Sequence, residues 1–196
     1  MVTGAFPTRG GGEFSSVETP IHGLFIMSRF QHKDARGSFS RIFNQDELSP
    51  LGWPSKVRQI NFSRTAAKGT IRGMHAQPGR TPEYKVVTCV RGAIWDVCVD
   101  LRKKSPTFLR WEAVELSETN ALSLLIPPGV AHGFQAMRNG VELVYCHSAP
   151  YEPNLEIGVS PFDPLLAISW PLGLTVLSDR DRKHRPLRPT FRGLTL

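Results

Sequence analysis

Short segments rich in strand-forming residues, separated by closely spaced turn signals, fill the middle of this chain of 196 residues. They include two pairs around turns: 86–90 and 93–100 around Arg91-Gly92, and 132–137 and 141–147 around Arg138-Asn139-Gly140. Asn-Gly is the strongest short hairpin signal, and we expect each pair to form a β-hairpin. Further strands are predicted over 111–116 and 123–126, and helix only near 44–48 and 178–181. The pattern predicts an all-β fold, built as an antiparallel barrel or sandwich.

The composition is that of one globular domain over residues 1–196, with a flexible N-terminal arm over 1–20 and a basic tail over 182–196. No apolar run approaches the ~18 residues of a membrane span. The Gly-rich start lacks the apolar region of a signal peptide. Cys89, Cys98 and Cys146 have no Cys-x-x-Cys spacing, so we interpret them as buried free thiols of a cytoplasmic protein.

The net charge of +7 raises the question of a nucleic-acid partner. Much of the excess lies between Arg180 and Arg192, where Pro186 and Pro189 interrupt the basic run. No recognised nucleic-acid motif accompanies it. We interpret the charge as a solubilising surface plus a few arginines in an anion site, and expect neither a nucleic-acid nor a membrane partner.

Strand parity places several polar side chains on shared faces. Side chains two residues apart in a strand point the same way, so Tyr145 shares a face with the apolar Val141 and Leu143. If that face is interior, Tyr145 is interior as well. The polar set that can then converge on one cavity is His75, Gln77, Lys85, His132 and Tyr145. Ionisable groups inside a barrel are costly unless paired or used, so this set marks a candidate functional site.

Two stretches carry polar residues at fixed distances from glycine and proline. One runs from Gly73 through His75 to Gln77, Lys85 and Gly92, and the other is Pro127-Pro128-Gly129-Val130-Ala131-His132. Together they resemble the two motifs of the cupin barrels, in which metal-binding members carry His and Glu at the positions of Gln77 and Lys85. An amide and an ammonium suit a divalent metal poorly but suit an anion or an enolate well. The resemblance implies a cupin-type double-stranded β-helix (jelly roll) with short peripheral helices and no metal.

A longer set of segments, each weak alone, is specific in its order and spacing. It comprises Asp34 to Phe39, Gln59 to Ser63, Lys68 to His75, Val90 to Val97, Ser105 to Phe108, Ile126 to Phe134, Tyr151 to Pro153, Glu156 to Gly158, Asp163-Pro164, and Leu177-Ser178 with Asp181. These segments resemble the dTDP-4-dehydrorhamnose 3,5-epimerases and related nucleotide-sugar epimerases. The resemblance implies a homodimer without cofactors that epimerises a nucleoside-diphosphate 4-keto-6-deoxy sugar at C3, C5 or both. The apolar stretch 16–30 is expected to add a strand across the dimer interface.

The resemblance also implies a role for each candidate residue. His75 matches the catalytic base and Asp181 the carboxylate that pairs with it. Lys85 matches the lysine near the keto oxygen, and Tyr145 matches the catalytic acid. The positions that match contacts to the substrate or its diphosphate are Arg36, Gln59, Asn61, Arg72, His132 and Glu156, and Arg41 stands at a further substrate-facing position.

The chemistry of such an epimerisation requires groups of these types, whether or not the resemblance is considered. A proton on C3 or C5 is acidic only because the carbanion delocalises onto the C4 oxygen, and imidazole is a suitable base. A carboxylate such as Asp181 can fix the tautomer of that imidazole. An ammonium such as Lys85 can stabilise the enolate, a contribution of about 3 kcal/mol for a preorganised donor. Inversion requires a proton from the opposite face, for which Tyr145 is suited, while Arg36 and Arg72 suit a diphosphate.

Three residues depart from the family's pattern. Arg41 stands where the family has Glu, Ala76 where the rhamnose-pathway enzymes carry an aromatic residue, and Pro150 where they carry Tyr. We interpret them as altered walls of the substrate site and expect the same reaction type on a substrate other than the usual rhamnose precursor; compensated drift with that precursor retained is the alternative. Two other functions stay open: a metal-dependent cupin isomerase or dioxygenase, and a non-catalytic sugar-binding cupin.

Overall fold

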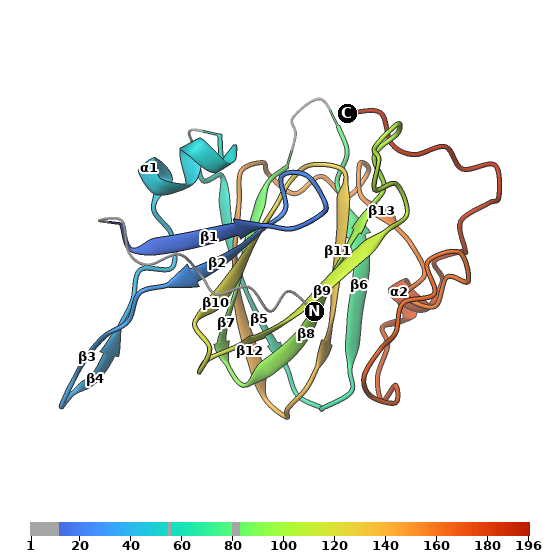
Figure 1. Cartoon of the computed structure of the whole chain (residues 1–196). Coiled ribbons are helices and arrows are strands. Elements are labelled where there is room, and N and C mark those ends of the chain that lie inside the picture. Colours follow the sequence, from blue (N-terminus) through green and yellow to red (C-terminus); the bar gives the residue numbers. More distant parts are fainter. Residues whose placement is uncertain (1–11, 55, 80–82) are drawn as a thin grey trace.

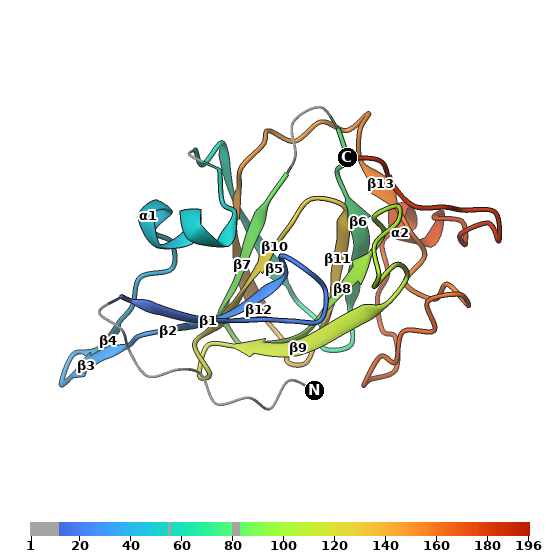
Figure 2. The same cartoon turned by 45° about the horizontal axis from the view of Figure 1, so that its top comes forward.

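The computed structural model describes residues 12–54, 56–79 and 83–196, and among these residues two antiparallel sheets face each other (Figures 1 and 2). The larger sheet has the strand order β1-β2-β10-β7-β12-β5, and the smaller has the order β13-β6-β11-β8-β9. Strands of the larger sheet are β1 Phe14–Glu18, β2 Phe25–Arg29, β5 Gln59–Thr65, β7 Lys85–Arg91, β10 Leu122–Ile126 and β12 Val141–His147. Those of the smaller sheet are β6 Ile71–Ala76, β8 Ala93–Asp100, β9 Trp111–Ser117, β11 Val130–Ala136 and β13 Ile157–Gly158. From β5 to β13 the chain changes sheet at every step except β8 to β9, which gives the predicted cupin-type jelly roll.

Both predicted hairpins are wrong. Although Gly92 and Gly140 adopt the positive φ angles that such turns use, 77° and 67°, each turn carries the chain from one sheet to the other. Strand β7 pairs with β10 and β12, while β8 pairs with β11 and β9; likewise β11 and β12 belong to different sheets. A turn fixes only the reversal of the chain. Which strands pair is decided by how the apolar face of each strand is buried. That burial depends on segments far away in the sequence.

The short elements lie at the periphery. Strands β3 His32–Asp34 and β4 Gly37–Phe39 form a separate hairpin that projects from the body of the molecule in both views (Figures 1 and 2). Helix α1 Gln45–Leu48, followed by the 3-10 turn η1 Ser49–Leu51, is capped by Asn44, and helix α2 Asp179–Arg182 is capped by Ser178. Both caps accept backbone N–H bonds, and the two helices lie where the sequence predicted helix.

The smaller sheet is covered on both faces. Its inner face contributes Ile94 and Cys98 to the cluster between the sheets, where Phe134 and Leu143 also pack. Its outer face carries a second cluster, formed by Met74, Ala76, Val97, Val99, Val159, Leu166 and neighbouring residues of the C-terminal segment. Burying one such large apolar side chain contributes about 2 kcal/mol, so both faces stabilise the sheet. Cys89, Cys98 and Cys146 are buried free thiols, as predicted.

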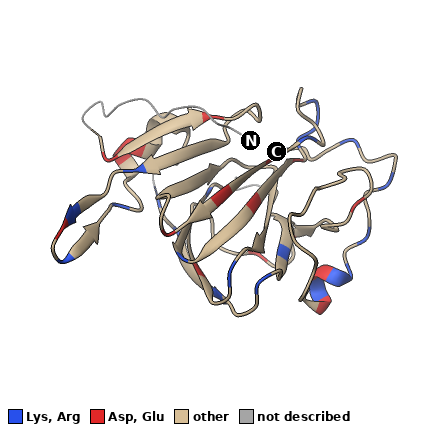
Figure 3. Cartoon of the chain, turned by 60° about the horizontal axis from the view of Figure 1, so that its bottom comes forward, with Lys and Arg blue, Asp and Glu red and all other residues tan. Residues whose placement is uncertain are grey.

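Both ends of the chain are more structured than predicted where they are described. Residues 1–11 of the predicted flexible arm lie outside the described residues, but Phe14–Glu18 form β1 and pair with β2. In the basic tail, Leu194 exchanges backbone hydrogen bonds with Leu101 and Lys103. Figure 3 shows acidic and basic residues alternating along α2, whose two acids directly precede this tail. Among the described residues, no helix has the length and apolar character needed to span a bilayer.

Candidate active site

A cavity of about 660 Å³ opens between the two sheets. The larger sheet lines it through β5, β7 and β12, and the smaller sheet through β6 and β11. All five residues predicted to converge are present: His75, Gln77, Lys85, His132 and Tyr145. The predicted Gln59, Asn61, Arg72, Glu156 and Asp181 line it as well.

The register of the larger sheet explains why residues distant in sequence meet here. Strand β12 pairs with β5 on one side and β7 on the other, which produces rows of three side chains across the sheet. The rows are Gln59–His147–Lys85, Asn61–Tyr145–Val87 and Ser63–Leu143–Cys89. The wall therefore changes from polar and charged at one end to apolar at the other.

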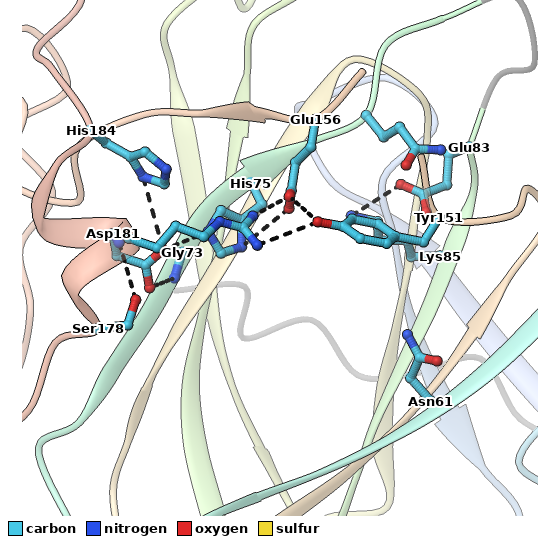
Figure 4. Close-up of polar contacts among 12 residues, drawn as sticks. Asn61, Gly73, His75, Glu83, Lys85, Tyr151, Glu156, Ser178, Asp181 and His184 are labelled. Carbon is cyan, nitrogen blue, oxygen red and sulfur yellow. Dashed lines mark hydrogen bonds and ion pairs between the residues drawn. The ribbon is translucent and has the colours of Figure 1, made fainter. Parts of the chain in front are cut away.

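His75 and Asp181 form an imidazole–carboxylate pair (Figure 4). His75 Nε2 lies 2.7 Å from Asp181 Oδ1, and the Gly73 N–H donates to Asp181 Oδ2 at 3.3 Å. Burial disfavours the charged form of Asp181, but the hydrogen bonds from His75 and Gly73 outweigh it and lower the pKa of this carboxyl. A charged Asp181 holds the imidazole proton on Nε2, which leaves Nδ1 free to accept a proton.

Tyr145 stands on the wall opposite His75, since it belongs to β12 of the larger sheet. Its hydroxyl lies 3.3 Å from Ser63 Oγ, and its ring meets His132 edge-on. Burial raises the pKa of Tyr145 well above its ordinary value of 10.0. Tyr145 therefore carries its proton at neutral pH and is a proton donor, not a base.

Lys85 does not stand alone at its end of the cavity. Its Nζ lies 3.1 Å from Glu83 Oε2, and His147 Nδ1 lies 3.0 Å from Glu83 Oε1. The sequence prediction missed Glu83 and His147. Parity could have placed His147 on the face of Tyr145, two residues earlier in β12, but Glu83 precedes the start of β7 at Lys85 and strand parity does not reach it.

His132 points into the cavity but is already paired. Its Nε2 lies 2.8 Å from Oδ2 of the fully buried Asp96 on β8. Burial raises the pKa of Asp96, against the opposing effect of the His132 ring. This contact fixes the orientation of the His132 ring in the cavity.

A polar bridge connects the two ends of the cavity. The Tyr151 hydroxyl donates to Glu156 Oε2 at 2.8 Å, and Glu156 Oε1 lies 3.8 Å from His75 Nδ1. Arg180 contacts both Glu156 and the Tyr151 hydroxyl. Figure 4 shows Glu156 and Tyr151 between the Asp181–His75 end and the Glu83–Lys85 end. Arg180, which the sequence prediction missed, immediately precedes Asp181 in α2 and adds a second cavity-lining arginine to Arg72.

Two predicted substrate contacts lie outside the cavity of their own chain. Arg36, in the turn of the β3–β4 hairpin, pairs with Asp34 and is highly exposed. Arg41 pairs with Glu47 of α1. The hairpin that carries Arg36 projects away from the two sheets (Figure 1), and Arg41 follows that hairpin, so the structure brings neither arginine to the cavity of its own chain.

The other departures from the family pattern are located as follows. Ala76 packs with Met74 in the outer cluster, and parity directs its side chain away from that of His75. The carbonyl of Pro150 accepts a hydrogen bond from Gln77 Nε2 at 2.9 Å, while Gln77 Oε1 accepts from the Glu152 N–H. Gln77 thus clamps the loop that carries Tyr151 and is not free to bind a metal.

One group among the described residues has donor atoms close enough to hold a metal ion: His75, Asp181 and His184. His184 packs edge-on against His75, with ring centroids 5.5 Å apart, and its buried Nδ1 has no hydrogen-bond partner in the described part of the chain. A cation bound here would be coordinated by His75 and Asp181, and the two side chains would no longer be free to act as the base and its partner. These donors therefore fit an inhibitory ion better than a cofactor needed for proton transfer.

The comparisons with known proteins agree with this geometry. The family model described as dTDP-4-dehydrorhamnose 3,5-epimerase matches residues 18–189. A dTDP-4-dehydrorhamnose 3-epimerase of Streptomyces niveus is 39% identical over 83% of this chain and 78% of its own. A dTDP-4-dehydrorhamnose 3,5-epimerase of Methanothermobacter thermautotrophicus is 36% identical over 90% of this chain and 96% of its own.

A solved structure gives the same result. The 4-keto-6-deoxy sugar epimerase from the novobiocin biosynthetic gene cluster of Streptomyces spheroides superposes with a TM-score of 0.84 at 36% identity, covering 90% of this chain and 88% of that one. The shared fold and the sequence identity extend over the strands that build the cavity. The chain therefore belongs to the dTDP-4-dehydrorhamnose 3,5-epimerase family, whose members are isomerases of nucleotide sugars.

Proposed function

We propose that this epimerase inverts C3, C5 or both in a nucleoside-diphosphate 4-keto-6-deoxy sugar, through an enolate. The observation that carries the proposal is that His75, paired with Asp181, and the protonated Tyr145 face one cavity from opposite sheets. Removal of a proton from one face and its return to the other face is what inversion requires.

The steps follow from the positions of the groups. His75 Nδ1 takes the proton beside the ketone, and Asp181 stabilises the imidazolium that results. The electron pair of the broken C–H bond moves onto the C4 oxygen, where the Lys85 ammonium stabilises the negative charge. Tyr145 then gives its proton to the same carbon from the opposite face, and the electron pair returns to form the new C–H bond.

The diphosphate is assigned to the cations and amides at the cavity wall. Arg72 is held by Thr65 Oγ1 at 3.1 Å, and Arg180 stands beside Glu156. Gln59 and Asn61 of β5 also line the cavity with amide groups. Forked hydrogen bonds from guanidinium groups suit phosphate oxygens, which supports Arg72 in this role.

The homodimer completes the site in this proposal. Arg36 lies far from its own cavity on a projecting hairpin whose Phe39 is 71% exposed, and Ile60 and Phe62 expose apolar side chains at the cavity mouth. A second copy would cover these surfaces if each hairpin reached the partner's cavity. Sedimentation showing a monomer at micromolar concentration would refute the dimer.

A mixing experiment tests the exchange of hairpins. Neither Arg36→Ala nor His75→Ala is expected to be active alone. An equimolar mixture is expected to regain up to about a quarter of the wild-type activity, because about half of its dimers would be mixed and one of the two sites in each mixed dimer would carry both wild-type residues. The pair Asp181→Asn and His75→Ala, whose residues belong to one cavity, is the matched control and should show no recovery. Absence of recovery with Arg36→Ala would place Arg36 outside the substrate site.

The cellular setting is proposed on the same residues. Three buried free thiols are suited to a reducing cytoplasm, and burial raises the pKa of Cys89 to about 11, which keeps this thiol unreactive. The cations that line the cavity are explained by the diphosphate. No nucleic-acid partner is therefore invoked for the positive net charge.

Incubation with dTDP-, CDP- and GDP-4-keto-6-deoxy sugars in deuterated water tests the activity. Exchange at C3 and C5, read by NMR, reports which carbon loses its proton and which is inverted. The question is open because the relatives include both a 3-epimerase and a 3,5-epimerase. No exchange with any sugar nucleotide would contradict the proposed function. Strong preference for dTDP-4-keto-6-deoxyglucose with inversion at both carbons would show that Arg41, Ala76 and Pro150 do not alter specificity.

A further inference from the structure

A line of hydrogen bonds follows the wall of the cavity away from Tyr151. The Tyr151 N–H donates to Gln59 Oε1 at 3.0 Å, and Gln59 Nε2 donates to Asn61 Oδ1 at 2.9 Å. Asn61 Nδ2 lies 3.4 Å from His147 Nε2. Each amide thus has its oxygen and one N–H group assigned, which fixes the orientation of both side chains.

The line continues through Glu83 to Lys85. His147 Nδ1 lies 3.0 Å from Glu83 Oε1, and Lys85 Nζ lies 3.1 Å from Glu83 Oε2. The two oxygens of one carboxylate therefore serve two different partners. Glu83 is 5% exposed, while His147 and Lys85 are 12% and 15% exposed, so all three are shielded from bulk water.

The chemistry of the donors sets the direction of every bond in this line. An amide nitrogen only donates, so His147 Nε2 must accept from Asn61. The proton of a neutral His147 is then on Nδ1 and is donated to Glu83. Both ring nitrogens are occupied, so His147 is a structural link and not a second base for the substrate.

Glu83 is costly to bury, and its contacts with His147 and Lys85 stabilise its charge. Burial disfavours its charged form, but the contacts with His147 and Lys85 outweigh that effect and lower the pKa of Glu83. A charged carboxylate at this place restrains the flexible side chain of Lys85. It holds the ammonium at the cavity surface before substrate arrives, which is the condition for effective stabilisation of an enolate.

We propose that Glu83, fixed by His147, is the positioning residue for the Lys85 ammonium. The inference rests on the proposed function, in which Lys85 meets the C4 oxygen. It adds to the site Glu83, which contacts Lys85, and His147, which contacts Glu83.

Steady-state kinetics of Glu83→Gln test the proposal. The amide keeps the size of the side chain and loses its charge, so we expect kcat to fall about 10- to 100-fold while KM changes less than about threefold. Glu83→Asp, which keeps the charge at shorter reach, should recover part of the loss. Glu142→Gln is the matched control, because Glu142 is an ion-paired carboxylate on β12 that faces away from the cavity.

A double-mutant cycle shows whether Glu83 acts through Lys85. If it does, Glu83→Gln lowers kcat in the wild type but has no further effect in a Lys85→Met background. Additive losses, or a kcat of Glu83→Gln within about twofold of wild type, would overturn the proposal. If Glu83→Gln does not fold, His147→Asn provides the same cycle with Lys85→Met, since it releases Glu83 at its other oxygen.

A chemical readout separates this proposal from the proposed function. Without the Glu83 carboxylate the Lys85 amine is no longer held in an ion pair, so Lys85 should react several-fold faster with an acylating reagent in Glu83→Gln, by peptide mass spectrometry. Lys68, an exposed lysine, should react at an unchanged rate. An unchanged rate of Lys85 acylation in Glu83→Gln would count against the ion pair between Glu83 and Lys85. Inactivity of the wild type on every sugar nucleotide would count against the proposed function alone.

Discussion

His75 Nε2 on strand β6 lies 2.7 Å from Oδ1 of Asp181 on helix α2, although 106 residues separate the two in the sequence. The same carboxylate accepts the Gly73 N–H, so it is anchored to the strand that carries its imidazole partner. The position of the Asp181 carboxylate is therefore set by both α2 and strand β6, and it can orient His75.

Asp181→Asn is expected to lower kcat about 100-fold or more, because the amide can present an N–H group to His75 Nε2 and so favour the wrong tautomer. Folding should be retained, since the side chain keeps its shape. Asp179→Asn, two residues earlier in the same helix and exposed, is the control and should be close to wild type. A normal rate for Asp181→Asn would remove Asp181 from the mechanism.

His75→Ala should abolish deuterium exchange at the epimerised carbon, because no other residue is assigned to take the proton. Tyr145→Phe should leave exchange measurable and reduce inversion about 100-fold, since only the second protonation is lost. The measurement is NMR of the sugar in deuterated water. Exchange at the wild-type rate in His75→Ala would show that the base is wrongly assigned.

Treatment with a chelator should leave the activity unchanged. At the two cupin metal positions that differ, Gln77 uses its amide to hold the Pro150–Glu152 loop and Lys85 is paired with Glu83. Neither is available as a metal ligand. Activity that is lost with chelator and restored by a divalent ion would contradict this expectation.

Excess Zn²⁺ should inhibit, because His75, Asp181 and His184 bring ligand atoms within 4.8 Å of one another. The expected cause is capture of the base by the metal. His184→Asn should weaken zinc inhibition about tenfold or more, as judged from the inhibition constant and from calorimetric titration of zinc. Equal inhibition of both proteins would place the zinc elsewhere.

Acid should destabilise the fold through Asp100. This buried carboxylate accepts hydrogen bonds from Arg102, Ser105 and Thr107, and although burial opposes them they lower its pKa from 3.8 to about 2. A carboxyl whose folded pKa is depressed adds stability above its unfolded pKa and loses it as the pH falls through the folded value. Between pH 5 and pH 2 the free energy of unfolding should lose about 2 kcal/mol from this group.

Urea unfolding at several pH values measures this effect. Asp100→Asn should be less stable than the wild type near pH 6, and the difference should shrink toward pH 2. Asp46→Asn, at an exposed position in α1, should follow the wild-type pH dependence. A constant difference between Asp100→Asn and wild type across the pH range would show that the pKa of Asp100 is not depressed.

The sequence by itself determined the strands between residues 86 and 147, the places of the two short helices and the side chains that share a face. Local periodicity and capping chemistry act over a few residues, which is why the Val141–Leu143–Tyr145 face and the helices near 44–48 and 178–181 could be predicted. The motif that contains Lys85 and Gln77 likewise predicted a cupin barrel whose cavity suits an anion. The spacing of motifs identified the same epimerase family that the comparisons show.

Tertiary structure alone decided which strands pair and which groups touch. The turns at Gly92 and Gly140 reverse the chain, but burial of two sheet faces against each other sends each following strand to the opposite sheet. The same packing placed Arg36 and Arg41 outside the cavity of their own chain. It also brought Glu83 and His147 to Lys85 through a cross-strand register set by non-local pairing, which periodicity along one strand does not specify.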